Sequence, residues 1–564
     1  MNHDITSTGA QFLARALKKH GVRRVYGLCG DHINALYRAL TLEEIQVVGT
    51  RTESGAVQMA DAEARVSGRL AVAVVTGCPG HTNALTGLSI AQNAQSPVLL
   101  ISGLTPVDQR DRGGSQVLHQ ADLARPVTKW ALEVPSAMHM AEIVTKAIQI
   151  ATSGTPGPVS LSVSADVLEH QITAGKDNPA DHLRPVISRA PLPVTVSLAG
   201  ESLELVRKLV EGASRPVLVL GTGARRDGST QRAQATVERL AMPVFTIDQA
   251  RGLVPDDGRL CFGYADPLFS RTFREVLDAD LVILAGAAID FHSCFGREQL
   301  LSSDVKILQI TEDPVLLNQC RQSELAIQAP PMQVLAALAE TVGAVSGRWS
   351  QWLGRMQRTY AENRDLWTVQ CHGFDTDNTI HPLQVCTSLQ RHQKADTGII
   401  IDAGDYVHWA RGFFPALAPG RWMDAVLIGN LGGSIPLGIG SQMAHGNGQT
   451  WAFIGDGGFG FSSWDLEVAV ERNLPLKIFL GNDACWGVEK RLQQGAYGVD
   501  VGCDLREIRY DKFAEMLGAT GVYVDDVKDL DAAVDRVVAA PGPALLNVRI
   551  RSGAGRPLAD FPRY

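Results

Sequence analysis

The sequence predicts an α/β protein made of three doubly wound parallel-sheet domains. At roughly 150 residues per domain, 564 residues give a prior of three or four domains. Short, uniformly apolar runs alternate with longer amphipathic stretches, a pattern typical of parallel strands covered by helices on both faces. Two stretches, 175–198 and 340–378, lack this alternation and divide the chain into three parts.

The apolar runs fall into three groups along the chain. Those in the first third are 70–76, 97–102 and 159–163; those in the middle are 217–220, 281–285 and 305–310; those in the last third are 399–402, 451–454, 476–480 and 544–550. We therefore expect domains over 1–175, 199–340 and 376–550, followed by a tail at 551–564. The first and last domains could share a fold without sharing sequence.

Composition and charge exclude several classes of protein. Lys and Arg number 52 against 60 Asp and Glu, which gives a net charge of −8 and no electrostatic footprint for nucleic acid. The nine cysteines contain no Cys-x-x-Cys pair, so neither a disulfide framework nor a zinc ribbon is indicated, and a cytoplasmic location fits best. We expect no targeting segment, because residues 1–10 are polar and lack an apolar core. We expect no membrane partner, because no apolar run approaches the roughly 20 residues of a spanning helix.

A glycine-rich turn after the apolar run 451–454 predicts a phosphate and metal site. Glycines there let backbone amides approach a phosphate, and a carboxylate can hold a divalent cation against it. Mg²⁺ prefers such hard oxygen ligands. The residues predicted to bind the phosphate-bearing cofactor are Gly455, Asp456, Gly457, Gly458, Phe459 and Asp483, and those predicted to bind the metal are Asp456, Asp483 and the carbonyl of Cys485.

A lone Gly-Asp-Gly is more often a simple turn, but its spacing here is specific. A helical stretch, Asn-Leu-Pro at 473–475, an apolar strand and Asn482 follow it. This arrangement resembles the signature of thiamine diphosphate (ThDP) enzymes, which implies that fold and the cofactors ThDP and Mg²⁺. Asp483 stands where that family more often has a second Asn.

The segment Arg51-Thr52-Glu53-Ser54-Gly55-Ala56 is similar to the Arg-x-Glu-x-x-Ala motif of the acetolactate synthase-like branch of this family. The resemblance implies that Glu53 hydrogen-bonds N1′ of the aminopyrimidine ring and promotes removal of the thiazolium C2 proton. The alternative is a solvated glutamate in the first turn of a helix, where the macrodipole favours it.

Further segments resemble cofactor-binding segments of the family. The loop 76–83 is similar to the Ser-Gly-Pro-Gly-Ala-Thr-Asn loop of acetolactate synthases, 429–432 to the segment that holds a bulky residue beneath the cofactor, and 403–406 to a diphosphate-binding strand end. They imply cofactor contacts for Pro79, Asn83, Gly404, Asp405, Tyr406, Gly429 and Leu431. For Leu431 a place in the core is the alternative.

Four polar residues are expected to manage protons on the substrate: Asp31, His32, Gln116 and Glu489. His32 and Gln116 resemble active-site residues of benzaldehyde lyase, whereas Asp31 and Glu489 resemble the acid pair of pyruvate decarboxylase. A histidine suits removal of a hydroxyl proton, and Glu489 could move a proton at the enamine carbon. The alternatives are a helix N-terminal aspartate, a packed histidine and a surface glutamate.

The resemblance implies a ThDP- and Mg²⁺-dependent carbon–carbon lyase or carboligase that acts through a C2 ylid and an enamine. Its small-molecule substrates would be 2-hydroxy ketones or 2-hydroxyacyl compounds, with coenzyme A (CoA) esters among them. The alternatives are a 2-oxo acid decarboxylase, an acetolactate synthase and a non-catalytic binding protein of the same fold. Because Glu53 and Asp456 lie in different predicted domains, we expect a homodimer or homotetramer with sites at the subunit interface.

The turn at 219–226 resembles the start of a nucleotide-binding loop, but Arg226 replaces its last glycine. The flavin-contacting segments of acetolactate synthase have no counterpart, so FAD is not expected. Arg225 and Arg226 leave an ADP or CoA contact open for the central domain. A flavin or nicotinamide oxidoreductase centred on 221–228 is the third alternative.

Overall fold

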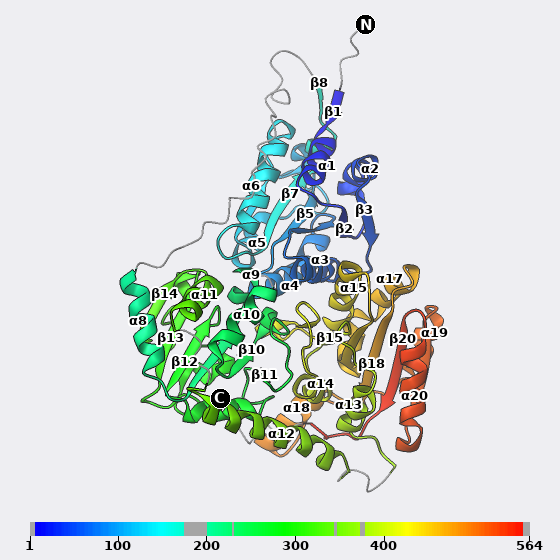
Figure 1. The fold of residues 1–564 in the computed structure, drawn as a ribbon. Coiled ribbons are helices and arrows are strands. Elements are labelled where there is room, and N and C mark those ends of the chain that lie inside the picture. The colour runs from blue at the N-terminus through cyan, green and yellow to red at the C-terminus, as the bar shows by residue number, and fades with distance from the viewer. Residues whose placement is uncertain (1–5, 174–199, 228–229, 343–346, 373–377, 556–564) are drawn as a thin grey trace. The chain divides into compact units, whose positions relative to one another are not determined.

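The computed structural model describes residues 6–173, 200–227, 230–342, 347–372 and 378–555 (Figure 1). These residues form three six-stranded sheets and one antiparallel ribbon, which pairs β1 (Thr6–Thr8) with β8 (Gln171–Thr173). Every strand pair in the three larger sheets is parallel. Helices flank each sheet, so the predicted α/β fold is confirmed.

The described residues belong to two compact units. Unit 1 draws on 1–193, 425–446 and 462–474, and unit 2 on 194–424, 447–461 and 475–564. The predicted boundaries at 175, 199 and 376, and most of the predicted tail, lie outside the described residues. The division into three domains therefore stays a prediction.

Unit 1 contains a sheet with strand order β3-β2-β4-β5-β7-β6. Its strands are β2 (Arg24–Gly27), β3 (Gln46–Gly49), β4 (Ala71–Val75), β5 (Val98–Leu104), β6 (Trp130–Glu133) and β7 (Val159–Ser164). Helices α1 (Gly9–Lys19), α2 (Asn34–Leu42), α6 (Met140–Thr152) and α7 (Ala165–Glu169) share one apolar core with the sheet. The remaining helices are α3 (Glu53–Ser67), α4 (Pro79–Asn93), α5 (Gln120–Ala124), α15 (Ser434–His445) and α17 (Leu466–Glu471). Among these, α3 packs against β2, β4, α4 and α15.

Unit 2 contains two sheets, with orders β11-β10-β9-β12-β13-β14 and β16-β15-β17-β18-β20-β19. The first has β9 (Pro216–Leu220), β10 (Val244–Thr246), β11 (Cys261–Tyr264), β12 (Leu281–Ala285), β13 (Lys306–Thr311) and β14 (Leu325–Gln328). The second has β15 (Gly398–Ile401), β16 (Trp422–Asp424), β17 (Thr450–Gly455), β18 (Leu476–Asn482), β19 (Thr520–Val524) and β20 (Ala544–Arg549).

The helices of unit 2 include one long connection and several that flank the two sheets. Near the first sheet are α8 (Gly200–Glu211), α9 (Thr222–Asp227), α10 (Thr230–Leu240) and α11 (Pro331–Thr341). The connection is α12 (Ser350–His372), which contacts α13, β11 and residues 272–278. Near the second sheet are α13 (Pro382–Gln390), α14 (Asp405–Phe413), α16 (Asp456–Ser462), α18 (Gly487–Tyr497), α19 (Tyr510–Met516) and α20 (Val527–Ala539).

The first and last sheets have the same topology. Numbered within each sheet in chain order, both read second, first, third, fourth, sixth, fifth, whereas the sheet of β9 to β14 reads third, second, first, fourth, fifth, sixth. Ligands of open parallel sheets bind where the strand order reverses, beyond the carboxyl ends of the strands. This rule points to the loops after β2 and β4 in unit 1 and after β15 and β17 in unit 2.

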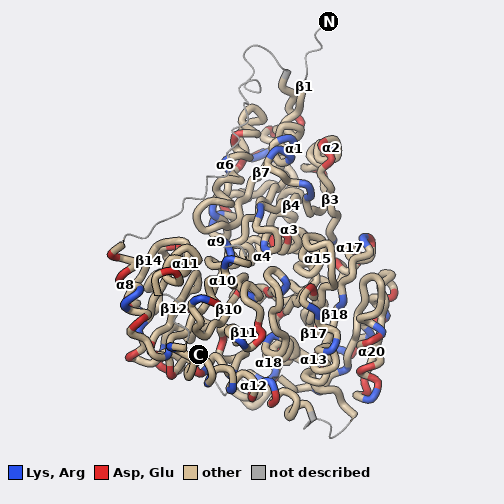
Figure 2. The backbone as a smooth tube through the Cα atoms, in the orientation of Figure 1, with Lys and Arg blue, Asp and Glu red and all other residues tan. Residues whose placement is uncertain are grey.

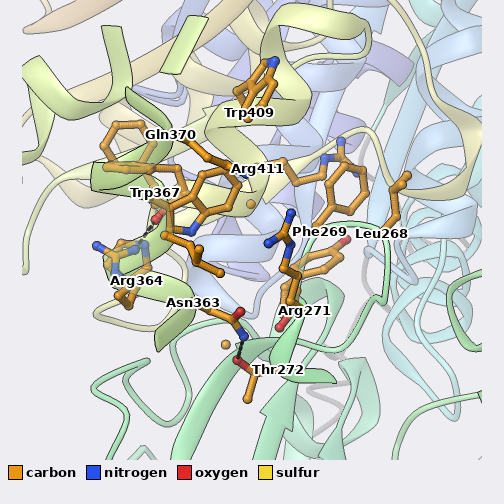
Figure 3. A pocket seen from close by; sticks show the side chains of 18 of the residues that line it. Leu268, Phe269, Arg271, Thr272, Asn363, Arg364, Trp367, Gln370, Trp409 and Arg411 are labelled. Atoms are coloured by element: carbon orange, nitrogen blue, oxygen red, sulfur yellow. Dashed lines mark hydrogen bonds between the residues drawn. The ribbon is translucent and has the colours of Figure 1, made fainter. Parts of the chain in front are cut away.

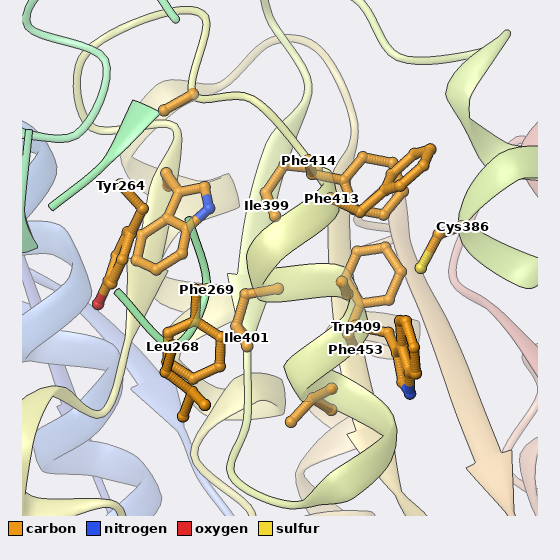
Figure 4. Close-up of a cluster of buried hydrophobic side chains, with 14 of the residues drawn as sticks. Tyr264, Leu268, Phe269, Cys386, Ile399, Ile401, Trp409, Phe413, Phe414 and Phe453 are labelled. Carbon is orange, nitrogen blue, oxygen red and sulfur yellow. The ribbon is translucent and has the colours of Figure 1, made fainter. Parts of the chain in front are cut away.

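The two sheets of unit 2 share one apolar core. Figure 4 shows Tyr264, Leu268 and Phe269 of the first sheet's side with Phe414 and Phe453 of the second. The rings of Phe414 and Phe453 lie 5.1 Å apart, a distance typical of packed aromatic pairs. This shared core makes one compact unit of the two sheets.

Charged residues are interspersed along the helices and strands of both units (Figure 2). All nine cysteines are free thiols. No helix in the described part of the chain is long and apolar enough to span a membrane.

Candidate active site

Two predicted metal ligands, Asp456 and Asp483, follow neighbouring strands in unit 2. Gly455 at the end of β17 is in register with Gly481 of β18. Because parallel strands end at the same sheet edge, the carboxylates that follow them lie close together. Asp456 also begins α16 directly after β17, one of the two strands between which the strand order reverses, and Asp483 follows the next strand, β18.

The Asp456 side chain is buried and only half satisfied. Its Oδ1 accepts a hydrogen bond from Gly457 N at 2.9 Å, whereas Oδ2 has no partner among the described residues. Burial, and then the neighbouring Asp483, raise the pKa of Asp456 to about 7. Burial also raises the pKa of Asp483. A buried, unpartnered carboxylate oxygen beside a second carboxylate fits a divalent cation.

The rest of a metal shell would not come from other acidic, histidine or cysteine side chains. The described ranges contain no group of three or more such side chains arranged to hold a metal. The Cys485 thiol donates to Asp483 Oδ2 at 3.1 Å, and burial, with the carboxylate, raises its pKa to about 12. Since the thiol stays protonated, Cys485 could contribute only its carbonyl, as the sequence predicts. Phosphate oxygens would complete the shell.

The turn at Gly404 leaves open space next to this carboxylate pair. Gly404 has φ 123°, and a Cβ there would meet nothing within 4 Å. The Asp405 carboxylate is neutralised by Arg491, whose Nε donates to Oδ2 at 2.5 Å. Tyr406 packs its ring over Gly481, where a Cβ would lie 2.4 Å from the ring. An open, glycine-lined turn beside a paired acid is compatible with a bound diphosphate.

The remaining predicted cofactor-binding residues of the glycine-rich turn differ in their surroundings. A Cβ on Gly457 would lie 2.3 Å from the Trp486 ring, so this position requires glycine. Gly455 has free space around its Cα, and Gly458 lies next to Asp402. Phe459 is buried and packs edge-on against Tyr510 at 5.2 Å.

Glu53, the predicted pyrimidine-binding residue, is the first residue of α3 in unit 1. Thr52 caps this helix, since its hydroxyl accepts from Gly55 N at 3.0 Å. The Glu53 side chain is buried, and its Oε2 accepts a hydrogen bond from Asn83 Nδ2 at 3.1 Å. Pro79 begins α4, which carries Asn83. The structure thus brings Glu53 and Asn83 together, as required if both bind one ring.

Asp465, which the sequence analysis did not identify, holds the start of α3. Its fully buried carboxylate accepts from Arg51 N at 3.0 Å and from the Thr52 hydroxyl at 3.1 Å. Burial raises the pKa of Asp465 to about 6. Its sequence neighbourhood reads as an ordinary amphipathic helix, so no local signal could have revealed this role.

His32 lies in the loop where the strand order of the unit 1 sheet reverses. Its Nδ1 is 3.3 Å from the Thr76 hydroxyl, and burial lowers its pKa. The neighbouring Asp31 is exposed. Gln116 is also exposed and has φ 59°, whereas Gln120, missed in the sequence, is buried. Gln120 donates to Gly103 O at 2.9 Å and accepts from Cys78 N at 2.6 Å, which fixes the 76–83 loop.

The last three predicted residues occupy exposed or partly buried positions. Glu489 is exposed in the first turn of α18 in unit 2. Gly429, at φ 62°, ends a short helical turn in unit 1, and the half-buried Leu431 follows it.

The predicted nucleotide turn of unit 2 is closely packed. A Cβ on Gly223 would lie 2.8 Å from the Cα of Gly286. Burial lowers the pKa of Arg225, and Arg226 lies 4.0 Å from Glu312. The contact of this turn with ADP or CoA stays a prediction.

Comparison of the chain with known protein families and proteins shows which proteins it is similar to. Residues 7–123, 203–338 and 402–548 match the N-terminal TPP binding domain, the central domain and the C-terminal TPP binding domain of the thiamine pyrophosphate enzymes. Similar proteins include 2-hydroxyacyl-CoA lyase 2 of Homo sapiens, 30% identical over 91% of this chain and 84% of that protein. The Caenorhabditis elegans protein of that name is 31% identical over 96% and 89%. The acetolactate synthase large subunit IlvG of Mycobacterium tuberculosis is 29% identical over 96% of both chains. The chain therefore belongs to the thiamine pyrophosphate enzyme family, in its acetolactate synthase-like branch, and is a ThDP-dependent enzyme.

Proposed function

We propose that the protein is a Mg²⁺-dependent carbon–carbon lyase or carboligase that acts on 2-hydroxyacyl compounds or 2-hydroxy ketones, with CoA esters among its substrates. The observation that carries the proposal is the environment of His32. This imidazole lies at the reversal point of the unit 1 sheet, and its lowered pKa favours the neutral form near pH 7. The relatives named 2-hydroxyacyl-CoA lyase 2 support the same substrate class.

In such a reaction, different residues of the chain would have different roles. When bound, ThDP supplies a carbon nucleophile and an electron sink. Asp456, Asp483 and the Cys485 carbonyl would hold Mg²⁺, and Gly404 would adjoin the diphosphate. Glu53, held by Asn83, would accept a hydrogen bond at the pyrimidine ring. Neutral His32 would remove the proton of the substrate hydroxyl oxygen, and Glu489 would return a proton to carbon.

A 2-oxo acid decarboxylase or acetolactate synthase is the second candidate. The acetolactate synthase relatives and the exposed pair Asp31 and Glu489 favour it. A decarboxylase releases CO2 and needs no base for a substrate hydroxyl, so the two candidates differ in product and in their need for His32.

Product analysis with ThDP and Mg²⁺ tests the proposal. We expect aldehyde release from a 2-hydroxy ketone or a 2-hydroxyacyl-CoA. CO2 release from pyruvate or a bulkier 2-oxo acid, without aldehyde release from either 2-hydroxy substrate, would replace the proposal by the second candidate.

We also propose that the enzyme is a homodimer or homotetramer. Unit 2 exposes large apolar side chains at the end of α18 and just beyond it: Tyr497 is 78% exposed and Val501 77%. Val499, between them, is 62% exposed, so these side chains form a run of exposed apolar groups, and larger exposed apolar patches mark interaction sites. Gel filtration with light scattering should give at least twice the 60.6 kDa chain mass, and an active monomer would contradict the proposal.

A further inference from the structure

A cavity of about 410 Å³ lies within unit 2, apart from the carboxylate pair of the candidate active site. Residues 262–274, α12, the second half of α14 and the segment 551–555 line it (Figure 3). Its size is within the range of sites for small organic ligands, which is about 300–1,000 Å³. Apolar rings form much of the wall, with Phe269, Trp367 and Trp409 among them.

The lining is strongly basic, although the whole chain is acidic. It contains six arginines and a single carboxylate, that of Asp256. Arg251 pairs with Asp256 at 2.7 Å, and Arg411 pairs with Asp424 at 3.0 Å, so these two guanidinium groups are neutralised within the protein. Arg271 and Arg364 pair with no carboxylate in the residues that the structure describes.

Arg271 is the group best placed to meet a ligand. Its side chain is exposed, and in Figure 3 its guanidinium projects into the cavity between Trp367 and Phe269. None of the described residues forms a hydrogen bond or ion pair with this guanidinium. Arg364 lies 5.2 Å from the centre of the Phe413 ring and donates one hydrogen bond, to Phe413 O at 2.7 Å, which leaves further N–H groups on its planar fork.

Guanidinium groups and aromatic rings together select a particular kind of ligand. Arginine forks recognise phosphate oxygens, and aromatic or guanidinium faces stack on a planar base. A ligand with both a phosphate chain and a base uses both features. A simple fatty acyl chain would leave the two unpaired guanidinium groups without an anion.

The segment 551–555 connects this cavity with the candidate active site. Ala554 O accepts from Trp409 Nε1 at 2.7 Å on the cavity side. On the other side, Ser552 Oγ is 3.7 Å from Cys485 Sγ, and a Cβ on Gly555 would lie 2.3 Å from Asp405 Oδ2. A ligand in the cavity therefore borders the turn that carries Asp405.

We propose that this cavity binds a nucleoside diphosphate. This nucleoside diphosphate is the nucleotide part of a CoA ester substrate, and the acyl end of that substrate reaches the active site. The assignment to a substrate rests on the proposed function, whereas the affinity for a nucleoside diphosphate does not. The site differs from the Arg225–Arg226 turn that the sequence suggested for ADP or CoA.

Calorimetric titration with ADP and with free CoA tests the cavity without any turnover. Both should bind the wild type, and Arg271→Ala should weaken both by about tenfold or more, since it removes a charge-assisted contact. Arg271→Ala should fold normally, because the side chain has no partner among the residues that the structure describes. The matched control is Arg259→Ala, an arginine whose side chain is 62% exposed outside the cavity and which should leave binding unchanged.

Steady-state kinetics show whether the bound nucleotide is part of a CoA ester substrate or a free nucleotide. If it belongs to the substrate, Arg271→Ala raises KM for a 2-hydroxyacyl-CoA by a similar factor and leaves kcat, and KM for a CoA-free 2-hydroxy ketone, unchanged. If Arg271→Ala weakens ADP binding but leaves both KM values unchanged, the occupant is a free nucleotide and the substrate assignment is wrong.

Two further outcomes are distinguishable. Failure of ADP and CoA to bind the wild type, or equal binding by Arg271→Ala and Arg259→Ala, would overturn the cavity proposal. Absence of lyase activity on every 2-hydroxy substrate, with nucleotide binding intact and sensitive to Arg271, would overturn the proposed function and leave the cavity assignment standing.

Discussion

The hydroxyl of Thr52 joins the buried carboxylate of Asp465 to the first turn of α3, since it donates to Asp465 Oδ2 at 3.1 Å and accepts from Gly55 N at 3.0 Å. Glu53 is the next residue. The position of this glutamate therefore depends on an acid that lies more than 400 residues later in the chain.

The raised pKa of Asp465 predicts a pH-dependent stability. Its value of about 6 lies above the ordinary value of 3.8, so folding favours the protonated form. The associated stability, about 3 kcal/mol at most, is fully present below about pH 4 and is lost as the pH rises through 6.

Comparison of wild type with Asp465→Asn checks this. The thermal midpoint of the wild type relative to the variant should fall between pH 4 and 7. A difference that does not change with pH would contradict the shifted pKa.

Glu53→Gln should lower turnover by a factor of about 100 or more, because the amide lacks the acid–base capacity of the carboxyl group. Cofactor binding, measured by calorimetry, should remain, since the amide can keep its contact with Asn83. Glu44→Gln, at a side chain that is 86% exposed, is the control and should be fully active. Normal turnover by Glu53→Gln would favour a protein of this fold that does not use the family's chemistry.

Asp456→Asn should raise the Mg²⁺ concentration needed for half-maximal activity by about tenfold or more, since it replaces the charged oxygen of the candidate metal site. Removal of metal with a chelator should abolish activity in the wild type, and added Mg²⁺ should restore it. Asp504→Asn, whose side chain is 76% exposed, should leave the Mg²⁺ requirement as it is. An unchanged requirement in Asp456→Asn would remove this residue from the metal site.

His32 should set the acidic limb of the pH profile. Burial lowers its pKa below 6.5, so the neutral base persists at neutral pH and is lost only on further acidification. In the wild type, the kcat/KM for a 2-hydroxy substrate should fall as the pH drops below the pKa of His32. His32→Gln should be slow, and its kcat/KM should not show this fall at acidic pH. His139→Gln, at an imidazole that is 59% exposed, should keep the wild-type profile.

The sequence predicted many, but not all, of the strands that are buried along their whole length. The run 281–285 coincides with β12, and 451–454 lies within β17. It did not predict β3, in which Val48 is buried while Gln46 and Gly49 are exposed. It also did not predict β2, β10, β11 and β16, which are mostly or fully buried but only three or four residues long. Apolar content alone reveals a strand only where helices cover both of its faces.

The site residues could be predicted where their spacing along the sequence indicates their chemistry. They could not be predicted where their role depends on contacts with residues far away in the sequence. Gly455 to Phe459 and Asp483 follow strands directly, so their common edge could be inferred. Gln120 and Asp465 are identified only by their contacts with Cys78 and Thr52. Each contact joins residues that are distant in the sequence, so it depends on the tertiary structure of unit 1. Strand order is likewise a long-range property.

The close packing of α15 against α3 limits how the chain can be divided. A Cβ on Gly440 would lie 2.2 Å from Met59 O, so the two helices touch backbone to backbone. Yet α15 and α17 enter unit 1 from the last third of the sequence. A fragment cut after the first sheet would therefore lack the cover of its own central helix, with apolar surface open to water. We therefore expect that residues 6–173 alone do not form a stable unit 1, and that the Glu53 end of the site requires the chain through α17.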